Sequence, residues 1–101
     1  MNKTVAEYHL ELGDLLRIAR TRREGPLAPM LELFRIVYGE PLPDGIAPWN
    51  VEVSRRLWEW LLRLAWKGLD EEDQIGVGFM YIDKGPSCSE DLPPCVIRVR
   101  G

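Results

Sequence analysis

The sequence contains few of the residues from which catalytic and metal sites are usually built. It has 101 residues, with one histidine, His9, and two cysteines, Cys88 and Cys95. One histidine and two cysteines seven positions apart match neither the ligand spacing of a zinc site nor a Cys-x-x-Cys redox pair. We therefore expect no metal site and interpret His9 as a packed or boundary histidine on an apolar helix face. The cysteines are either free thiols or a disulfide that closes a loop.

Motifs that bind phosphate or calcium, or that carry out catalysis, are also missing. The glycines of "GVG" at 76–78 fall inside an apolar run, whereas a dinucleotide-binding loop needs Gly-x-Gly-x-x-Gly leading into a helix. The acidic run "DEED" at 70–73 lacks the alternating spacing and the glycine of a calcium loop, so we expect a solvated turn. No catalytic triad or paired-carboxylate arrangement stands out, and general bases are few. The sequence thus predicts a protein that is not an enzyme and has no cofactor or small-molecule substrate.

Long uncharged segments and an excess of one charge are absent as well. No uncharged run approaches the ~20 residues that a membrane-spanning helix needs, and the N-terminus has no apolar signal region. The formal net charge is only -3, which is mild and of the wrong sign for a protein that binds polyanions through its overall charge. We expect a soluble, cytoplasmic protein with no membrane contact.

The chain does contain enough apolar residues to fold. Hydrophobic residues make up 46% of the sequence and charged residues 29%, with four tryptophans. This composition argues against intrinsic disorder, and the length suits one domain. We expect residues 1–101 to form a single small α+β domain.

Three helices are predicted in the first two thirds of the sequence. The first starts at Thr4, which could form a capping box with Glu7, and ends before the Gly-Pro at 25–26. The second starts at Pro26 or Pro29 and ends at Tyr38, before Gly39, and from Pro29 to Tyr38 it is apolar around most of its circumference. The third runs from about Val51 to Lys67 and carries a wide apolar arc that includes three tryptophans.

Two strands are predicted at the C-terminal end. Ile75 to Asp83 is rich in β-branched and aromatic residues, and "CVIRVR" at 95–100 alternates between apolar and polar. A long loop with three prolines joins them. The predicted fold class is therefore α+β: three α-helices followed by a C-terminal antiparallel β-hairpin, with a single layer of helices packed on a small sheet.

This arrangement would leave apolar surface uncovered. The strand at 75–83 is apolar on both faces, and a two-stranded hairpin with an open edge is marginally stable in water. We therefore expect a protein partner or a second copy of the chain, as in a homodimer, bound through an apolar helix face and a strand edge. Small one-domain modulators encoded by phages and mobile elements are an analogy for such a protein. The candidate contacts are the aromatic residues Trp58, Trp66, Phe79 and Tyr81, with a charged rim of Arg17, Arg20 and Arg23.

A second interpretation is a DNA-binding regulator, because three helices followed by a hairpin resembles the element order of winged-helix domains. Such a domain uses a polar recognition helix and usually a cationic wing. Here the connection between the second and third helices is long, the third helix is broadly apolar, and the predicted hairpin loop carries Glu90 and Asp91. These features favour the protein-interaction hypothesis over binding to nucleic acid.

Overall fold

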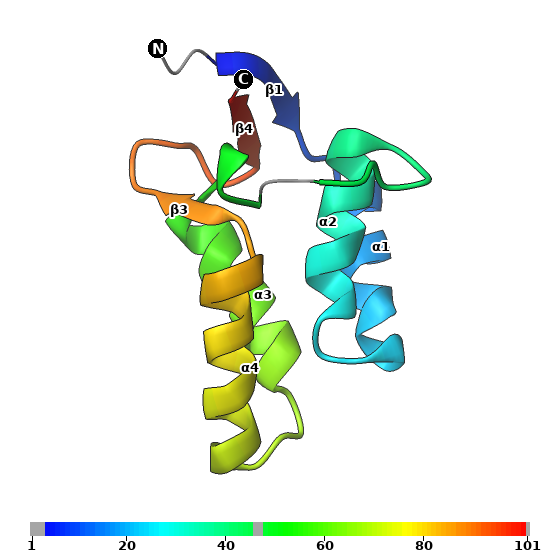
Figure 1. Cartoon of the computed structure of the whole chain (residues 1–101), viewed down its shortest axis with the longest axis vertical. Coiled ribbons are helices and arrows are strands. Elements are labelled where there is room, and N and C mark those ends of the chain that lie inside the picture. The colour runs from blue at the N-terminus through cyan, green and yellow to red at the C-terminus, as the bar shows by residue number, and fades with distance from the viewer. Residues whose placement is uncertain (1–3, 46–47, 101) are drawn as a thin grey trace.

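A computed structural model shows four α-helices and a four-stranded mixed sheet within the residues that it describes, 4–45 and 48–100. The first and the last of the described elements are strands, and the helices come in two consecutive pairs (Figure 1). The strands are β1 (Thr4–His9), β2 (Val51–Ser54), β3 (Ser87–Ser89) and β4 (Val96–Arg100). The helices are α1 (Leu12–Arg20), α2 (Ala28–Tyr38), α3 (Arg55–Trp66) and α4 (Glu71–Lys84), with short 3-10 helices η1 (Thr21–Glu24) and η2 (Pro48–Asn50).

The sheet has the strand order β1-β4-β2-β3, so the C-terminal strand lies in its interior. β4 pairs antiparallel with both β1 and β2, and β3 pairs parallel with β2. Ile97 is opposite Tyr8 on one side and Val53 on the other. Ile97, Val53 and Val51 are fully buried, so this face of the sheet contributes to the core.

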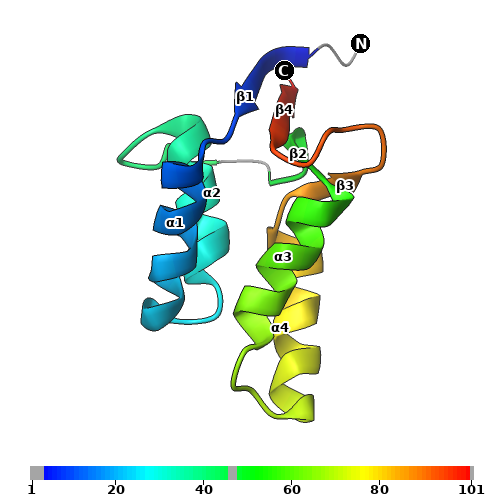
Figure 2. The same cartoon turned by 180° about the vertical axis from the view of Figure 1, so that it is seen from behind.

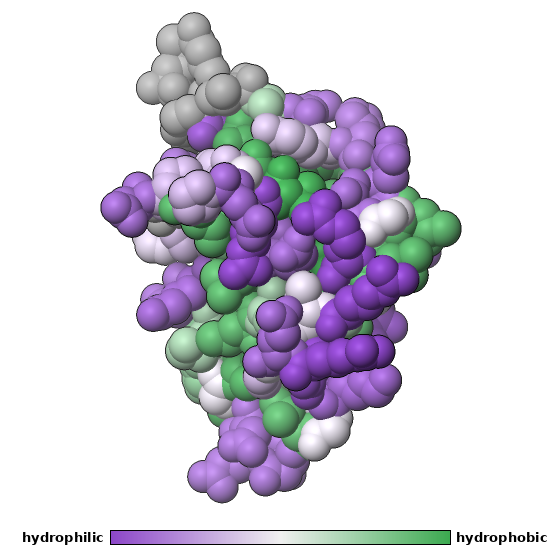
Figure 3. Space-filling model, turned by 90° about the vertical axis from the view of Figure 1, so that its right-hand side faces the viewer, coloured by the Kyte–Doolittle hydropathy of each residue, from purple (hydrophilic) through white to green (hydrophobic). Residues whose placement is uncertain are grey.

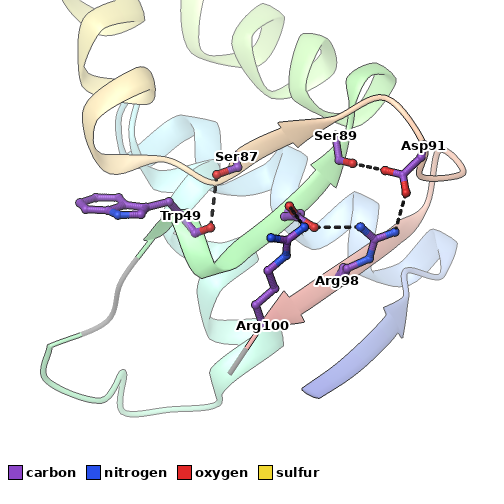
Figure 4. A network of polar contacts seen from close by, with 7 residues as sticks. Trp49, Ser87, Ser89, Asp91, Arg98 and Arg100 are labelled. Atoms are coloured by element: carbon purple, nitrogen blue, oxygen red, sulfur yellow. Dashed lines mark hydrogen bonds and ion pairs between the residues drawn. The ribbon is translucent and has the colours of Figure 1, made fainter. Parts of the chain in front are cut away.

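The opposite face of the sheet carries a network of ion pairs (Figure 4). The carboxylate of Glu52 accepts a hydrogen bond from Arg98 at 3.0 Å and lies 2.9 Å from the guanidinium of Arg100. Arg98 also donates to Asp91 at 3.0 Å. Alternation along β2 and β4 thus places apolar residues toward the core and paired charges on the outer face.

The helix pairs α1–α2 and α3–α4 extend from the sheet in the same direction (Figures 1 and 2). Their facing sides form one hydrophobic core together with the inner face of the sheet. The largest fully buried side chains include Ile18 of α1, Leu33 of α2, Leu61 of α3 and Tyr81 of α4. Helix α2 confirms the second predicted helix: it begins at Ala28, between the two predicted starts at Pro26 and Pro29, and ends at Tyr38 as predicted.

The N-terminal segment is a strand, so the predicted helix start at Thr4 is wrong. α1 begins at Leu12, where the carboxylate of Asp14 accepts from the backbone N–H of Glu11 at 2.9 Å. His9 is exposed on β1 and is not packed on an apolar helix face. The third predicted helix also starts later than expected, because Val51–Ser54 pairs with β4 before α3 begins at Arg55.

The predicted C-terminal hairpin is also wrong. The segment expected to be its first strand, Ile75 to Asp83, lies within α4. The "DEED" run is the start of that helix and not an isolated turn, because the side chain of Asp70 accepts from the backbone N–H of Asp73 at 2.8 Å. The second predicted strand is correct to within one residue, but β4 pairs with β1 and β2. An α+β architecture is therefore confirmed, while the arrangement of three helices and a hairpin is only partly matched.

Within residues 4–45 and 48–100, no helix is both long enough and apolar enough to cross a membrane.

Candidate protein-binding surface

The candidate site is built on the helical hairpin of α3 and α4. The two helices are joined by a short turn in which Gly68 has a φ of +78°, a conformation that favours glycine. Asp70 caps the start of α4, and Glu71, Glu72 and Asp73 occupy the first turn. Carboxylates at this position stabilise the positive end of the helix dipole. The N-terminal end of α4 is therefore acidic, because carboxylates cap the helix and fill its first turn.

The inner face of α4 is held in place by Tyr81. Its side chain is fully buried, and its hydroxyl donates to the carbonyl oxygen of Pro26 at 2.8 Å. The ring meets that of Trp58 edge to face, with 6.0 Å between ring centroids. Burial raises the pKa of Tyr81 to about 12, although a backbone contact at Met30 and the charge of Arg22 partly oppose this shift. Tyr81 thus connects α4 to both α3 and the turn before α2.

Trp66, the last residue of α3, links α3 to the N-terminal part of α4. Its indole N–H donates to the carbonyl oxygen of Gln74 at 2.9 Å, and the Gln74 side-chain amide donates to the carbonyl oxygen of Leu69 at 3.1 Å. A Cβ placed on Gly78 would lie 3.6 Å from the Trp66 ring. The Trp66 ring therefore packs against α4 at Gly78, where a methyl group would still be in ordinary van der Waals contact with the ring.

The outer face of α4 carries an exposed apolar stripe. Ile75, Phe79 and Ile82 are 57%, 68% and 72% exposed. Their spacing of i, i+4 and i+7 places them on one side of a helix. Beside them lies a hollow of about 250 Å³ between α3 and α4. Its lining residues are Trp66, Glu71, Gln74, Ile75, Gly78, Phe79 and Ile82. We call Ile75, Phe79 and Ile82, together with this hollow, the α4 surface.

A second and larger hollow of about 610 Å³ flanks α4 on its other side. Met80, which is 37% exposed, lies in its wall together with Leu27 from the turn before α2. Glu72 and Asp73 also line it. Exposed apolar residues with acidic residues beside them therefore occur on two sides of α4.

Comparison of the chain with protein-family models, with curated proteins and with solved structures gives no match.

The arginines at the end of α1 fall into two groups. Arg22 donates to the carbonyl oxygen of Leu64 at 2.6 Å and also to that of Lys67, so it caps the C-terminal end of α3. Arg17 is bound 2.8 Å from Glu32, whose carboxylate is almost buried on α2. Arg20 and Arg23 are exposed, and neither forms an ion pair with another residue in the described part of the chain.

Exposed leucines on α1 form a second apolar surface. Leu12 is 71% exposed and Leu16 is 46% exposed, one helical turn apart. Arg20 follows at the same spacing. The side of the molecule with α1 and α2, shown in Figure 3, has hydrophobic surface beside strongly hydrophilic side chains. We call Leu12, Leu16, Arg20 and Arg23 the α1 surface.

The structure separates the aromatic residues predicted to contact a partner. Phe79 is largely exposed, and Trp66 is half-buried in the wall of the hollow beside it. Trp58 is half-buried and packs on the core, while Tyr81 is inside the core. Ile75 and Ile82 were missed because their segment was interpreted as a strand. The signal that could have found them is the helical spacing of Ile75, Phe79 and Ile82 behind an acidic N-cap.

The metal-ligating residues and the two cysteines form no site within the described ranges. Within 4–45 and 48–100, no group of three or more His, Cys, Asp or Glu residues could hold a metal ion. Cys88 and Cys95 are exposed free thiols, so the alternative of a loop-closing disulfide is not what the structure shows. Although Cys88 is exposed as a residue, neighbouring atoms partly shield its thiol from solvent, and this desolvation raises the pKa of the thiol above its ordinary value. The raised pKa lowers its reactivity at neutral pH.

Proposed function

We propose that this protein is a non-enzymatic protein-interaction module that binds its partner through the α4 surface. The observation that carries the proposal is the exposure of Ile75, Phe79 and Ile82 on a helix whose opposite side is anchored in the core. Contiguous apolar side chains beside a hollow are typical of sites that receive a helix or an apolar segment of another protein.

The construction of the hairpin supports this assignment. A binding face is more effective when its residues are fixed before the partner arrives, because less conformational entropy is lost on binding. Here the buried Tyr81 and the hydrogen-bonded Trp66 hold α4 against its neighbours. Phe79 and Trp66 are the candidate contacts, whereas Trp58 and Tyr81 position the helix that carries them.

The element order that suggested a winged-helix DNA-binding regulator does not occur in the structure. That resemblance depended on three helices followed by a hairpin, whereas in the structure α4 lies between α3 and the last two strands, and β3 and β4 each pair with β2. The exposed face of α4 is apolar and acidic, which is unfavourable next to phosphates. We therefore favour a protein partner over nucleic acid.

Site-specific photo-crosslinking tests the proposed function. A photoreactive phenylalanine analogue at position 79 should give discrete cross-linked products in the cells that naturally make the protein. The control probe is at Asp44, an exposed position in the loop after α2 and away from α4. The products should disappear when Ile75→Glu and Ile82→Glu are added. The proposal is wrong if the probe at position 79 yields no more product than the probe at position 44.

A further inference from the structure

We propose that the α4 surface binds the α1 surface of a second copy of this chain, in a head-to-tail contact. This inference depends on the proposed function, since it names the partner of the same surface. The two surfaces are distinct parts of one molecule, and each has what the other lacks: α4 offers an apolar stripe with an acidic end, and α1 offers exposed leucines followed by unpaired arginines in the described chain.

The apolar parts of the two surfaces have matching lengths. Leu12 and Leu16 are one helical turn apart, and so are Phe79 and Ile82. When the two helices run antiparallel with Leu16 opposite Phe79, Leu12 comes within one position of Ile82. The leucines then cover Phe79 and Ile82 and reach the hollow that Trp66 lines. Helix packing of this kind buries side chains that are exposed on both surfaces of the free chain.

The charges match in the same register. Seven residues separate Leu16 from Arg23, and seven separate Glu72 from Phe79. With Leu16 opposite Phe79, Arg23 comes opposite Glu72 in the acidic first turn of the partner's α4, and Arg20 comes opposite Ile75, one turn further along that helix. Arg17 is already paired with Glu32 and is not required for this contact. Opposite charges at the rim of an apolar contact fix its register and orientation.

A symmetric contact between two α4 helices offers fewer complementary charges. Four acidic residues and one basic residue occur in Glu71–Lys84. An antiparallel pair of these helices centred on Phe79 would place Asp83 of one copy opposite Ile75 of the other, and Lys84 would be the one cation of Glu71–Lys84 near the partner's acidic first turn. The α1 surface, which ends in arginines, is the better complement to α4.

A contact between different surfaces has a consequence for assembly. α1 and α4 belong to different helix pairs on opposite sides of the molecule (Figures 1 and 2). A pair of bound copies therefore still presents one free α1 surface and one free α4 surface. Such a heterologous contact continues into a chain of copies or closes into a ring, rather than stopping at a two-fold dimer.

Sedimentation velocity of the purified chain tests this proposal. The average mass of the wild type should rise beyond that of a dimer as the concentration is raised to about 1 mM, the range in which small transient interfaces assemble. Phe79→Glu and Leu16→Glu should each weaken association by about tenfold or more, since each buries a charge at the centre of the contact. Trp49→Glu is the matched control: Trp49 is 63% exposed but belongs to neither surface, and its variant should assemble like the wild type.

Mixing the two variants distinguishes this contact from a symmetric one. Phe79→Glu retains a working α1 surface, and Leu16→Glu retains a working α4 surface. An equimolar mixture should therefore form dimers of one copy of each, while either variant alone stays monomeric. No rise in mass on mixing, or association that Leu16→Glu leaves intact, would overturn the proposal. Circular dichroism of each variant shows whether it is folded.

The outcome also separates this proposal from the proposed function. If the wild type stays monomeric at every concentration and the probe at position 79 cross-links only a different protein, the inference of self-assembly is wrong while the α4 surface remains a protein-binding site. If the probe at position 79 gives no product and the wild type stays monomeric, both are wrong. Cross-links from position 79 to α1 of another copy support both.

Discussion

The hydroxyl of Tyr81 in α4 donates a hydrogen bond to the backbone carbonyl of Pro26, which lies 55 positions earlier in the chain. Tyr81 has no exposed surface, and its ring also contacts Trp58 of α3. One side chain therefore joins three parts of the molecule: α4, α3 and the turn that precedes α2. The exposed stripe on the other side of α4 is positioned by this buried residue.

Replacing Tyr81 with phenylalanine should lower stability without changing the fold. The substitution keeps the buried ring but removes the donor to Pro26, which leaves a carbonyl oxygen without its partner. The cost of such a loss is about 1–2 kcal/mol in the free energy of unfolding. Urea denaturation followed by circular dichroism measures it. Tyr8→Phe, which changes a partly exposed ring on β1, is the control and should shift stability by less than about 0.5 kcal/mol.

Tyr81 should also make stability depend on alkaline pH. Its pKa in the folded chain is about 12, above the ordinary value of 10.0, so the folded state holds the phenolic proton more tightly than the unfolded state. This contribution is fully present below pH 10 and is lost as the pH rises through about 12. Burial also raises the pKa of Tyr38, which acts in the same direction.

The contribution of Tyr81 is isolated by comparing two denaturation series, one for the wild type and one for Tyr81→Phe, between pH 9 and pH 12. A shift of this size corresponds to about 2–3 kcal/mol at most. The wild type should therefore lose stability more steeply than the variant above pH 10. Parallel curves for the two proteins would show that Tyr81 does not titrate in this way.

Ser54→Ala tests the junction at which β2 becomes α3. The Ser54 hydroxyl accepts from the backbone N–H of Leu57 at 3.1 Å and donates to the carbonyl oxygen of Pro94 at 2.8 Å, and the residue is buried. Removing this helix cap should destabilise the fold by about 1–2 kcal/mol in thermal or chemical denaturation. Ser87→Ala is the matched control. Its hydroxyl bonds the Trp49 carbonyl at an exposed position, so the same change should have a much smaller effect there.

Segments whose structure follows from local pattern could be predicted from the sequence. Helix α2 has a proline near its start, a glycine after its end and an apolar character that suits a central helix, and the structure confirms it. β4 alternates between apolar and charged residues, and its strand was predicted correctly. Its neighbours in the sheet were not, because pairing with β1 and β2 is decided by contacts between distant parts of the chain.

The error at α4 has a specific cause. Its β-branched, aromatic and glycine residues are typical of strands, and this composition outweighed two helix signals. The first signal is the acidic start after Asp70, and the second is the spacing of the inward-facing Gln74, Val77 and Tyr81. Contacts with Trp58 and Trp66 stabilise the helical conformation of α4, which its own residues favour only weakly. The candidate site could be predicted as an apolar surplus near Phe79, but its helical form required the tertiary structure.

Two glycines associated with α4 should respond in opposite ways to alanine. Gly76 lies in the helix interior at an exposed position, and a Cβ there would meet no atom within 4 Å. Gly76→Ala should therefore stabilise the protein by about 0.5–1 kcal/mol, since alanine loses less backbone entropy in a helix. At Gly85, a Cβ would overlap the carbonyl oxygen of Tyr81 and lie 3.1 Å from the sulfur of Met30.

Gly85→Ala should consequently destabilise the fold by about 1–3 kcal/mol, because a buried backbone segment and a core methionine must move to admit one methyl group. The same urea denaturation applied to both variants measures the two signs side by side. If Gly85→Ala were as stable as the wild type, the turn from α4 into β3 could not be packed as closely on Tyr81 as the structure has it. If Gly76→Ala were destabilising, residues 71–84 would not be helical, and the stripe formed by Ile75, Phe79 and Ile82 would not exist.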